Sequence, residues 1–153
     1  MLAWDAADTA VAISAVALVV SLIAAIYTRQ ESQAVKHANA PEVTAEAKRN
    51  GQGQEYGLLT LTVSTRHAIK SLTVGVLPGS AVDRLGLPKS NETDRQTVVL
   101  ADVAGGTPIE LPVHWQATGD ATRLRVTITG PAFARTSIVL EPPDSTPWVG
   151  MIY

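Results

Sequence analysis

The chain of 153 residues contains no cysteine. Without thiols it can form no disulfide, thiolate zinc site or iron–sulfur cluster, and it has no cysteine nucleophile. Aromatic residues are also scarce, at 5% of the chain, with a single phenylalanine. Because a cysteine-free chain tolerates either redox environment, its composition leaves the compartment open.

Charge of either sign is sparse as well, at 17% of residues against about 25% in an average domain. Twelve basic residues stand against 14 acidic ones, which gives a net charge of −2. That balance argues against a basic surface for nucleic acid, so we expect no nucleic-acid partner. The length suits one domain of ordinary size plus an appendage.

The longest hydrophobic run covers residues 10–26 and contains no charge, proline or glycine, with Ser14 and Ser21 as its only polar members. Seventeen residues at about 1.5 Å each span roughly 26 Å, close to the thickness of a bilayer's hydrocarbon core. The sequence therefore predicts a transmembrane helix over residues 9–27, with the lipid bilayer as its first partner.

The flanks of this run predict how it sits in the membrane. Trp4 precedes it and Tyr27 closes it, which is where interfacial aromatic rings are found, and Arg29 follows directly. No Lys or Arg precedes the run, whereas Arg29 and Lys36 follow it. Positive charge favours the cytoplasm, so we predict a plasma-membrane anchor with the tail 1–8 outside and the rest of the chain cytoplasmic.

A cleaved signal peptide is the alternative interpretation of the same run. The segment Ala38-Asn39-Ala40 has the small-x-small form of a processing site. However, the residues before the run carry Asp5 and Asp8 in place of positive charge, and Pro41 would follow the cut. An uncleaved signal-anchor is favoured.

Small residues recur within the run at four-residue spacing, namely Ala17, Ser21 and Ala25. Such a stripe allows another helix to approach closely, which predicts self-association or packing against other membrane helices. Alanine is so frequent here that chance also produces the pattern.

Residues 28–40 are polar and free of glycine and proline, which predicts that the helix continues as a juxtamembrane linker. Pro41 should end it, because the residue before a proline is disfavoured in the α region.

Beyond Pro41 the hydrophobic pattern alternates, which is typical of β-strands. The alternating segments are 43–47, 56–64, 72–76, 97–103, 109–115, 124–128 and 136–141, with a long loop over 80–95. No helical segment separates them, so parallel β/α folds are excluded. The predicted fold class is mainly β, with the transmembrane helix followed by an antiparallel β-sandwich of about seven strands over residues 41–141.

Trp115 lies on a central segment and resembles the core tryptophan of immunoglobulin-like sandwiches, here without the paired cysteines of antibody domains. The resemblance implies an immunoglobulin-like sandwich. Pro112 on the same segment suggests an edge strand or a bulge.

Motifs that carry chemistry are missing: the chain has no nucleophile elbow, P-loop or His-Glu-x-x-His. His37 and His67 are interpreted as solvated side chains, and His114 alternates with core positions and should face solvent. We therefore predict a protein that is not an enzyme, with no catalytic, cofactor or metal residues.

Four carboxylates cluster around the long loop and offer oxygen ligands of the kind that calcium binds: Asp83, Glu92, Asp94 and Asp102. Their spacing is not that of a calcium loop, and basic residues interleave them, so a solvated loop is favoured. Arg123 and Arg125 form a small basic stripe that is interpreted as exposed sheet surface.

Residues 142–153 consist of a proline-rich linker and an apolar tip with Trp148, Ile152 and Tyr153. Leaving these side chains in water is unfavourable, so the tip should dock. Three docking places remain open: its own sandwich, the membrane interface, or a protein partner.

The opening Trp4-Asp5-Ala6-Ala7, the Ala/Val-rich run, Arg29 and the Ala/Val/Thr-rich β region together form a recognisable layout. This layout resembles small single-pass membrane proteins encoded by high-GC actinobacteria and their phages. The resemblance implies membrane anchoring and no particular activity.

The expected function is a membrane-anchored binding or scaffolding module that presents its β-sandwich to a protein partner. The alternatives are an accessory subunit of a membrane enzyme or transport complex, or an envelope-facing binding domain if the orientation is reversed.

Overall fold

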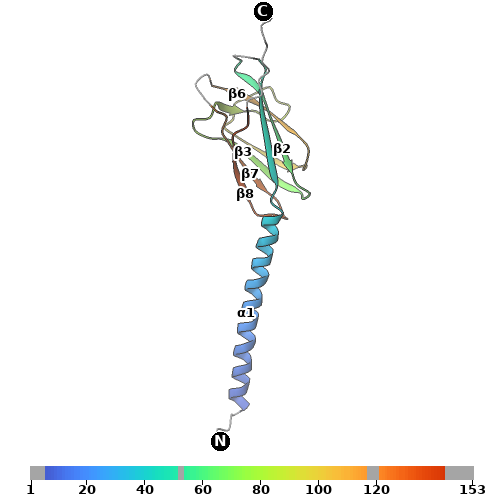
Figure 1. Cartoon of the computed structure of the whole chain (residues 1–153), viewed down its shortest axis with the longest axis vertical. Coiled ribbons are helices and arrows are strands. Elements are labelled where there is room, and N and C mark those ends of the chain that lie inside the picture. The colour runs from blue at the N-terminus through green and yellow to red at the C-terminus, as the bar shows by residue number, and fades with distance from the viewer. Residues whose placement is uncertain (1–5, 52–53, 117–120, 144–153) are drawn as a thin grey trace, which may run out of the picture. The chain divides into compact units, whose positions relative to one another are not determined.

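The computed structural model describes residues 6–51, 54–116 and 121–143, which divide into two units between Ala38 and Asn39. The first unit is one helix and the second consists of two β-sheets (Figure 1). The predicted fold class, mainly β with an N-terminal apolar helix and two antiparallel sheets, is confirmed.

Helix α1 (Ala6–Ala38) runs without interruption for 33 residues, about 50 Å at 1.5 Å per residue. Its apolar side chains from Thr9 onward are exposed; Leu18, for example, is 70% exposed. The helix is long and apolar enough to cross a membrane, a property that N-terminal signal sequences share.

Polar side chains within α1 are satisfied by the helix itself. The hydroxyls of Ser14, Ser21 and Thr28 each donate to the carbonyl four residues earlier, at 2.8–2.9 Å. Within a bilayer, where no water could bind a free hydroxyl, this arrangement would leave none of these three hydroxyls without a partner.

The second unit contains eight strands in two four-stranded sheets, and every strand pair is antiparallel. The strands are β1 (Glu42–Arg49), β2 (Tyr56–Ser64), β3 (Ile69–Val76), β4 (Val82–Leu85), β5 (Thr97–Val103), β6 (Ile109–Trp115), β7 (Leu124–Thr129) and β8 (Thr136–Leu140). One sheet, sheet A, has the order β1-β2-β6-β4, and the other, sheet B, has the order β5-β3-β7-β8.

The alternating residues of both sheets supply a single core. Leu59, Leu61 and Val63 on β2 are fully or almost fully buried, as are Leu72 and Val74 on β3. Each such side chain removed from water contributes about 1.5–3 kcal/mol. The two apolar faces therefore hold the sheets together as a sandwich.

Trp115 is the largest buried side chain, at 2% exposure, which confirms its predicted place in the core. It packs against Gly57, where an added Cβ would clash with the Lys48 carbonyl oxygen and crowd the indole ring. Glycine at this position is therefore what lets β1, β2 and the tryptophan come together.

The prediction of seven strands missed β4, which lies in the segment predicted to be a loop. Val82 and Leu85 are buried, but a bulge separates them, so two residues stand between apolar positions and the alternation is broken. A four-residue strand with a bulge carries too little periodicity to be found by pattern.

Strand β6 as a whole lies between β2 and β4, but Pro112 itself lies where β4 no longer pairs with β6, so the suggested edge is present locally. Proline is tolerated there because β4 ends at Leu85, so no ladder partner is lost on that side. The predicted bulge exists on the neighbouring strand β4 and not on β6.

Residues 141–143 lead from β8 in sheet B to the edge of sheet A. The carbonyl of Pro143 accepts a hydrogen bond from the Ala47 N–H on β1, at 3.2 Å. The chain thus joins the two sheets at their β1 and β8 edges.

Candidate functional site

Sheet A leaves part of strand β6 without a neighbour. Strand β4 pairs only with residues 113–115, so residues 109–112 have β2 on one side and no strand on the other. At about 3.3 Å per residue, this open stretch is about 13 Å long.

The backbone of Glu110 faces that open side. Trp115 N–H donates to Glu55 on the β2 side, whereas Pro112 C=O accepts from Gly86 on the β4 side. Because backbone groups alternate along a strand, Glu110 N–H and C=O point the same way as those of Pro112. No described residue is hydrogen-bonded to them there.

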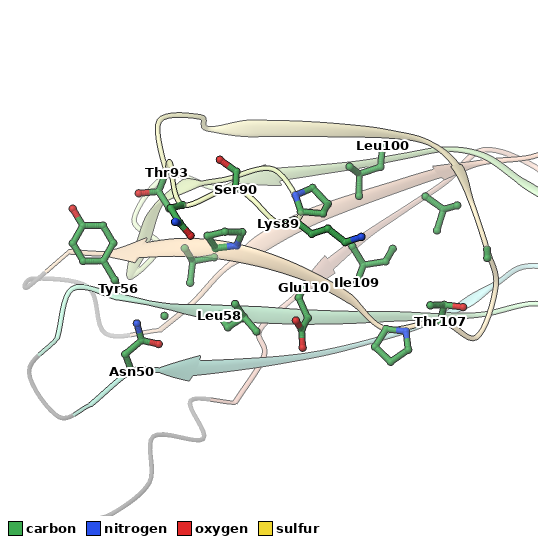
Figure 2. Close-up of a pocket in the computed structure, with 18 of the residues that line it drawn as sticks. Asn50, Tyr56, Leu58, Lys89, Ser90, Thr93, Leu100, Thr107, Ile109 and Glu110 are labelled. Atoms are coloured by element: carbon green, nitrogen blue, oxygen red, sulfur yellow. The ribbon is translucent and has the colours of Figure 1, made fainter.

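A groove of about 750 Å³ lies along this stretch, within the size range of ligand sites. Strands β2 and β6, the turn after β4, and β5 with the turn that follows it form its walls, and it is called here the β6 groove (Figure 2). Its apolar lining consists of Leu58, Pro88, Leu100, Ala101, Val103, Ala104, Pro108, Ile109, Pro112 and Val113.

Only two charged side chains line the β6 groove among the described residues, Lys89 and Glu110. Neither has an ion-pair partner within that part of the chain. In Figure 2 they lie on opposite sides of β6, with Lys89 on the side of Leu100 and Glu110 on the side of Leu58.

One end of the groove is bounded by a histidine cluster. Tyr56, which lines the groove, packs edge-on against His114 with 5.1 Å between ring centroids. His114 Nδ1 lies 2.6 Å from Asp83 Oδ1, and its Nε2 lies 3.5 Å from Glu55 Oε2. His114 lies on the outer face of sheet A, as expected, but it is only 23% exposed.

The pKa of Asp83 is lowered from its ordinary value of 3.8. Burial acts to raise this pKa, but hydrogen bonds from His114 and Gln116 and the charge of His114 together outweigh burial. An ionised Asp83 can only accept a hydrogen bond, so His114 Nδ1 carries the proton between them.

The contacts of His114 have a structural role, because they attach β4 to β6. Asp83 is the extra residue of the β4 bulge, and its bond to His114 ties that bulge to β6. Among the described residues no hydroxyl is hydrogen-bonded to His114, whose two ring nitrogens both face carboxylates. The geometry therefore fixes the short strand β4, and with it the start of the turn that borders the groove.

The carboxylates around the long loop have different partners and do not act together. Asp94 is exposed beside Arg95 at 3.5 Å, whereas Asp83 is bound to His114. In the described ranges no three His, Cys, Asp or Glu side chains are grouped so that they can hold a metal ion. Arg123 pairs with Glu141 at 3.1 Å on the surface.

The predicted anchor and association residues that the structure describes all lie on α1 with their side chains exposed: Ala17, Ser21, Ala25, Tyr27 and Arg29. The hydroxyl of Ser21 donates to Ala17 C=O within the helix. Trp4, Trp148, Ile152 and Tyr153 lie outside the described residues. The roles proposed for these residues stay predictions.

Sequence reasoning missed the groove and its principal residues. Tyr56, Leu58 and Pro112 project from the outer face of sheet A, where their types are unremarkable in a half-exposed strand. The segment Leu87-Pro88-Lys89-Ser90 gave no signal either, because proline followed by a non-glycine residue is ordinary in a type I turn, and only the positive φ of Lys89 in the structure makes this turn unusual.

No protein-family model matches the chain, and no curated protein matches it. Among solved structures, the chain is similar to BslA, titled a bacterial hydrophobin, with 9% sequence identity and a TM-score of 0.37. The match covers 69% of this chain and 99% of that chain. A likeness at this level carries no argument about fold or function.

Proposed function

We propose that this chain is a membrane-anchored binding module that holds an extended segment of a partner protein in the β6 groove. Helix α1 is the anchor in this proposal, and the two-sheet unit is the binding domain, with an immunoglobulin-like type of sandwich. The proposed role is binding and not catalysis.

The single observation that carries the proposal is the half-empty place beside β6. An extended peptide laid along residues 109–112 would continue sheet A beyond the end of β4, and its backbone would meet Glu110 N–H and C=O. This is the mode called β-augmentation, in which main-chain bonds give affinity and side-chain pockets give specificity. The apolar lining around Leu58 and Ile109 supplies such pockets.

The proposed orientation puts the binding domain in the cytoplasm and residues 1–8 outside the plasma membrane. It is supported by the Lys/Arg bias, with none before residue 9 and Arg29 and Lys36 after the apolar run. Alkaline phosphatase fused after Tyr153 should be inactive, whereas a fluorescent protein there should be bright. The opposite pair of results would favour an envelope-facing domain.

Site-specific photo-crosslinking tests the groove on the full chain in membranes. A benzoylphenylalanine residue at Leu58, which lines the groove, should capture one defined protein, whose crosslinked peptide is read by mass spectrometry. The matched control is the same residue at Val139, which is 50% exposed on β8 of sheet B.

The proposal is supported if capture occurs at Leu58 but not at Val139. Capture at Leu58 should also be lost in the variant Pro112→Asp, which places a charge in the apolar lining and leaves Lys89 and Glu110 unchanged. Equal capture at both positions, or none at Leu58, contradicts the proposal. A captured protein that is itself an integral membrane enzyme or transporter would favour the second candidate, an accessory subunit that associates through the stripe of Ala17, Ser21 and Ala25.

A further inference from the structure

The turn that borders the β6 groove has a backbone conformation that its sequence does not favour. Ser90 N–H donates to Leu87 C=O at 3.0 Å, which closes a tight turn with Pro88 and Lys89 at its centre. Lys89 has φ of +64°. A proline at the second position of a turn and a positive φ at the third position are typical of a type II turn, in which the third position favours glycine or asparagine.

Lys89 stands apart from the other residues with positive φ in the described part of the chain. Two of them are glycines, Gly79 and Gly106, and the third is Asp102, a type that tolerates this region. A lysine there carries a backbone penalty that a glycine would avoid. Strain of this kind persists where the side chain is needed, so it directs attention to what Lys89 does.

The Lys89 side chain reaches along the β6 groove toward Leu100 and Ile109 (Figure 2). Its ammonium group has no ion-pair partner among the described residues. Among the described residues, the only other charged group of the lining is Glu110, on the opposite side of β6 in Figure 2. A cation thus stands over an apolar groove beside the open backbone of β6.

We infer that Lys89 determines the specificity of the groove, which selects an extended peptide segment that carries an aspartate or glutamate side chain. The inference rests on the proposed function. The segment pairs with the Glu110 backbone, its apolar side chains meet Leu58 and Ile109, and its carboxylate accepts hydrogen bonds from the Lys89 ammonium. An acidic side chain is the complement of Lys89, the one cation that lines the groove among the residues the structure describes.

A peptide-display selection tests this without knowledge of the natural partner. The probe is a library of random seven-residue peptides, and the bait is the full chain in lipid nanodiscs. Peptides selected by the wild-type chain should be enriched in Asp or Glu at one position. Their affinity should fall about 10-fold or more for Lys89→Met, as expected for loss of a charge-assisted hydrogen bond, and change little for Lys89→Arg.

Lys89→Gly separates specificity from folding. Glycine relieves the strained turn, so the melting temperature should rise by about 4 °C, while affinity for the acidic peptides falls as it does for Lys89→Met. A gain in stability together with a loss of binding is not expected if Lys89 is only a structural residue of the turn.

Selected peptides without an acidic preference, or equal binding by the wild-type chain and Lys89→Met, would overturn the inference and leave the groove intact as a binding site. A lower melting temperature for Lys89→Gly would overturn the strain argument. If no peptide is selected at all, the proposed function itself fails.

Discussion

The helix and the β-sandwich are built from the same aliphatic residues and treat them in opposite ways. Leu18 on α1 is 70% exposed, whereas Leu59 on β2 is completely buried. In the helix, apolar residues follow one another on every side, whereas in the strands they alternate with polar ones. The arrangement of the leucines along the chain, and not their number, decides whether each one needs a membrane or a protein core.

The two regions also differ in how they satisfy the backbone. Every carbonyl and N–H in the middle of α1 is bonded within the helix, which needs no neighbour. The sheets bond across strands and so leave edges, one of which is the open stretch of β6 beside Glu110. A binding site made from backbone groups is therefore available in the sandwich and not in the helix.

The largest expected effect comes from the same substitution made in both regions. Leu59→Ala should lower the free energy of unfolding of the sandwich by about 2–5 kcal/mol, because it leaves a cavity in a packed core. Leu18→Ala should leave that unfolding unchanged. Urea unfolding of the full chain in detergent micelles, followed by near-ultraviolet circular dichroism, to which the buried Trp115 contributes, measures both. Equal losses would contradict the comparison.

Introducing a charged residue should affect the helix and leave the sandwich surface unaffected. Leu18→Arg places a cation near the middle of the apolar run, which costs about 2.5–3.5 kcal/mol in a spanning helix. The expected result is a clear loss of chain from carbonate-washed membranes. Val139→Arg, on the outer face of sheet B, is the control and should have no effect. Full retention of Leu18→Arg in the membrane fraction would argue against a spanning helix.

Acid should weaken the sandwich through Asp83. Because its folded pKa lies below the ordinary value of 3.8, the ionised carboxylate stabilises the fold at neutral pH, and this contribution is lost as pH falls below that value through the folded pKa. Asp83→Asn should therefore lower stability by about 1.5–3 kcal/mol at pH 7, the scale of a hydrogen bond to a charged group.

The difference between wild type and Asp83→Asn should shrink when urea unfolding is repeated near pH 3. Asp94→Asn is the control, because Asp94 is exposed and its contact with Arg95 is a surface pair. A difference that stays constant with pH would mean that Asp83 acts through packing and not through its charge.

The smallest effect is expected from the surface ion pair of Arg123 and Glu141, in which both side chains are about half exposed or more. Pairs of this kind contribute about 0–1 kcal/mol because water and salt screen them. Arg123→Ala should change the unfolding free energy by less than about 0.5 kcal/mol. A much larger loss would mean that the β7 and β8 edge depends on this pair.

The helix and most strands could be predicted from the sequence because their hydrophobic patterns are long or regular. Residues 10–26 form one uninterrupted apolar run, and Leu59, Leu61 and Val63 alternate without a break. Strand β4 was missed because four residues with a bulge have no clear period. Periodicity reports which face of a strand is buried, and it reports nothing about which strand lies beside it.

The candidate site was beyond sequence reasoning for that reason. The open stretch of β6 exists because β4 pairs with only part of its length, and this follows from strand order and register. His114 was placed correctly on the outer side of its strand, but its partner Asp83 is 31 residues away. Contacts between distant residues depend on topology, which local patterns do not encode.

The strand order also sets a sequence of events during synthesis. Ser71 on β3 and Thr129 on β7 share a hydrogen bond of 2.6 Å although they are 58 residues apart. Strand β2 likewise cannot pair with β6 until β6 has been synthesised. Such distant pairing makes folding slow, in the range of milliseconds to seconds for all-β domains. Helix α1 needs only its own residues and is made first. If α1 is the membrane anchor proposed above, it would enter the membrane before the β-sandwich has folded.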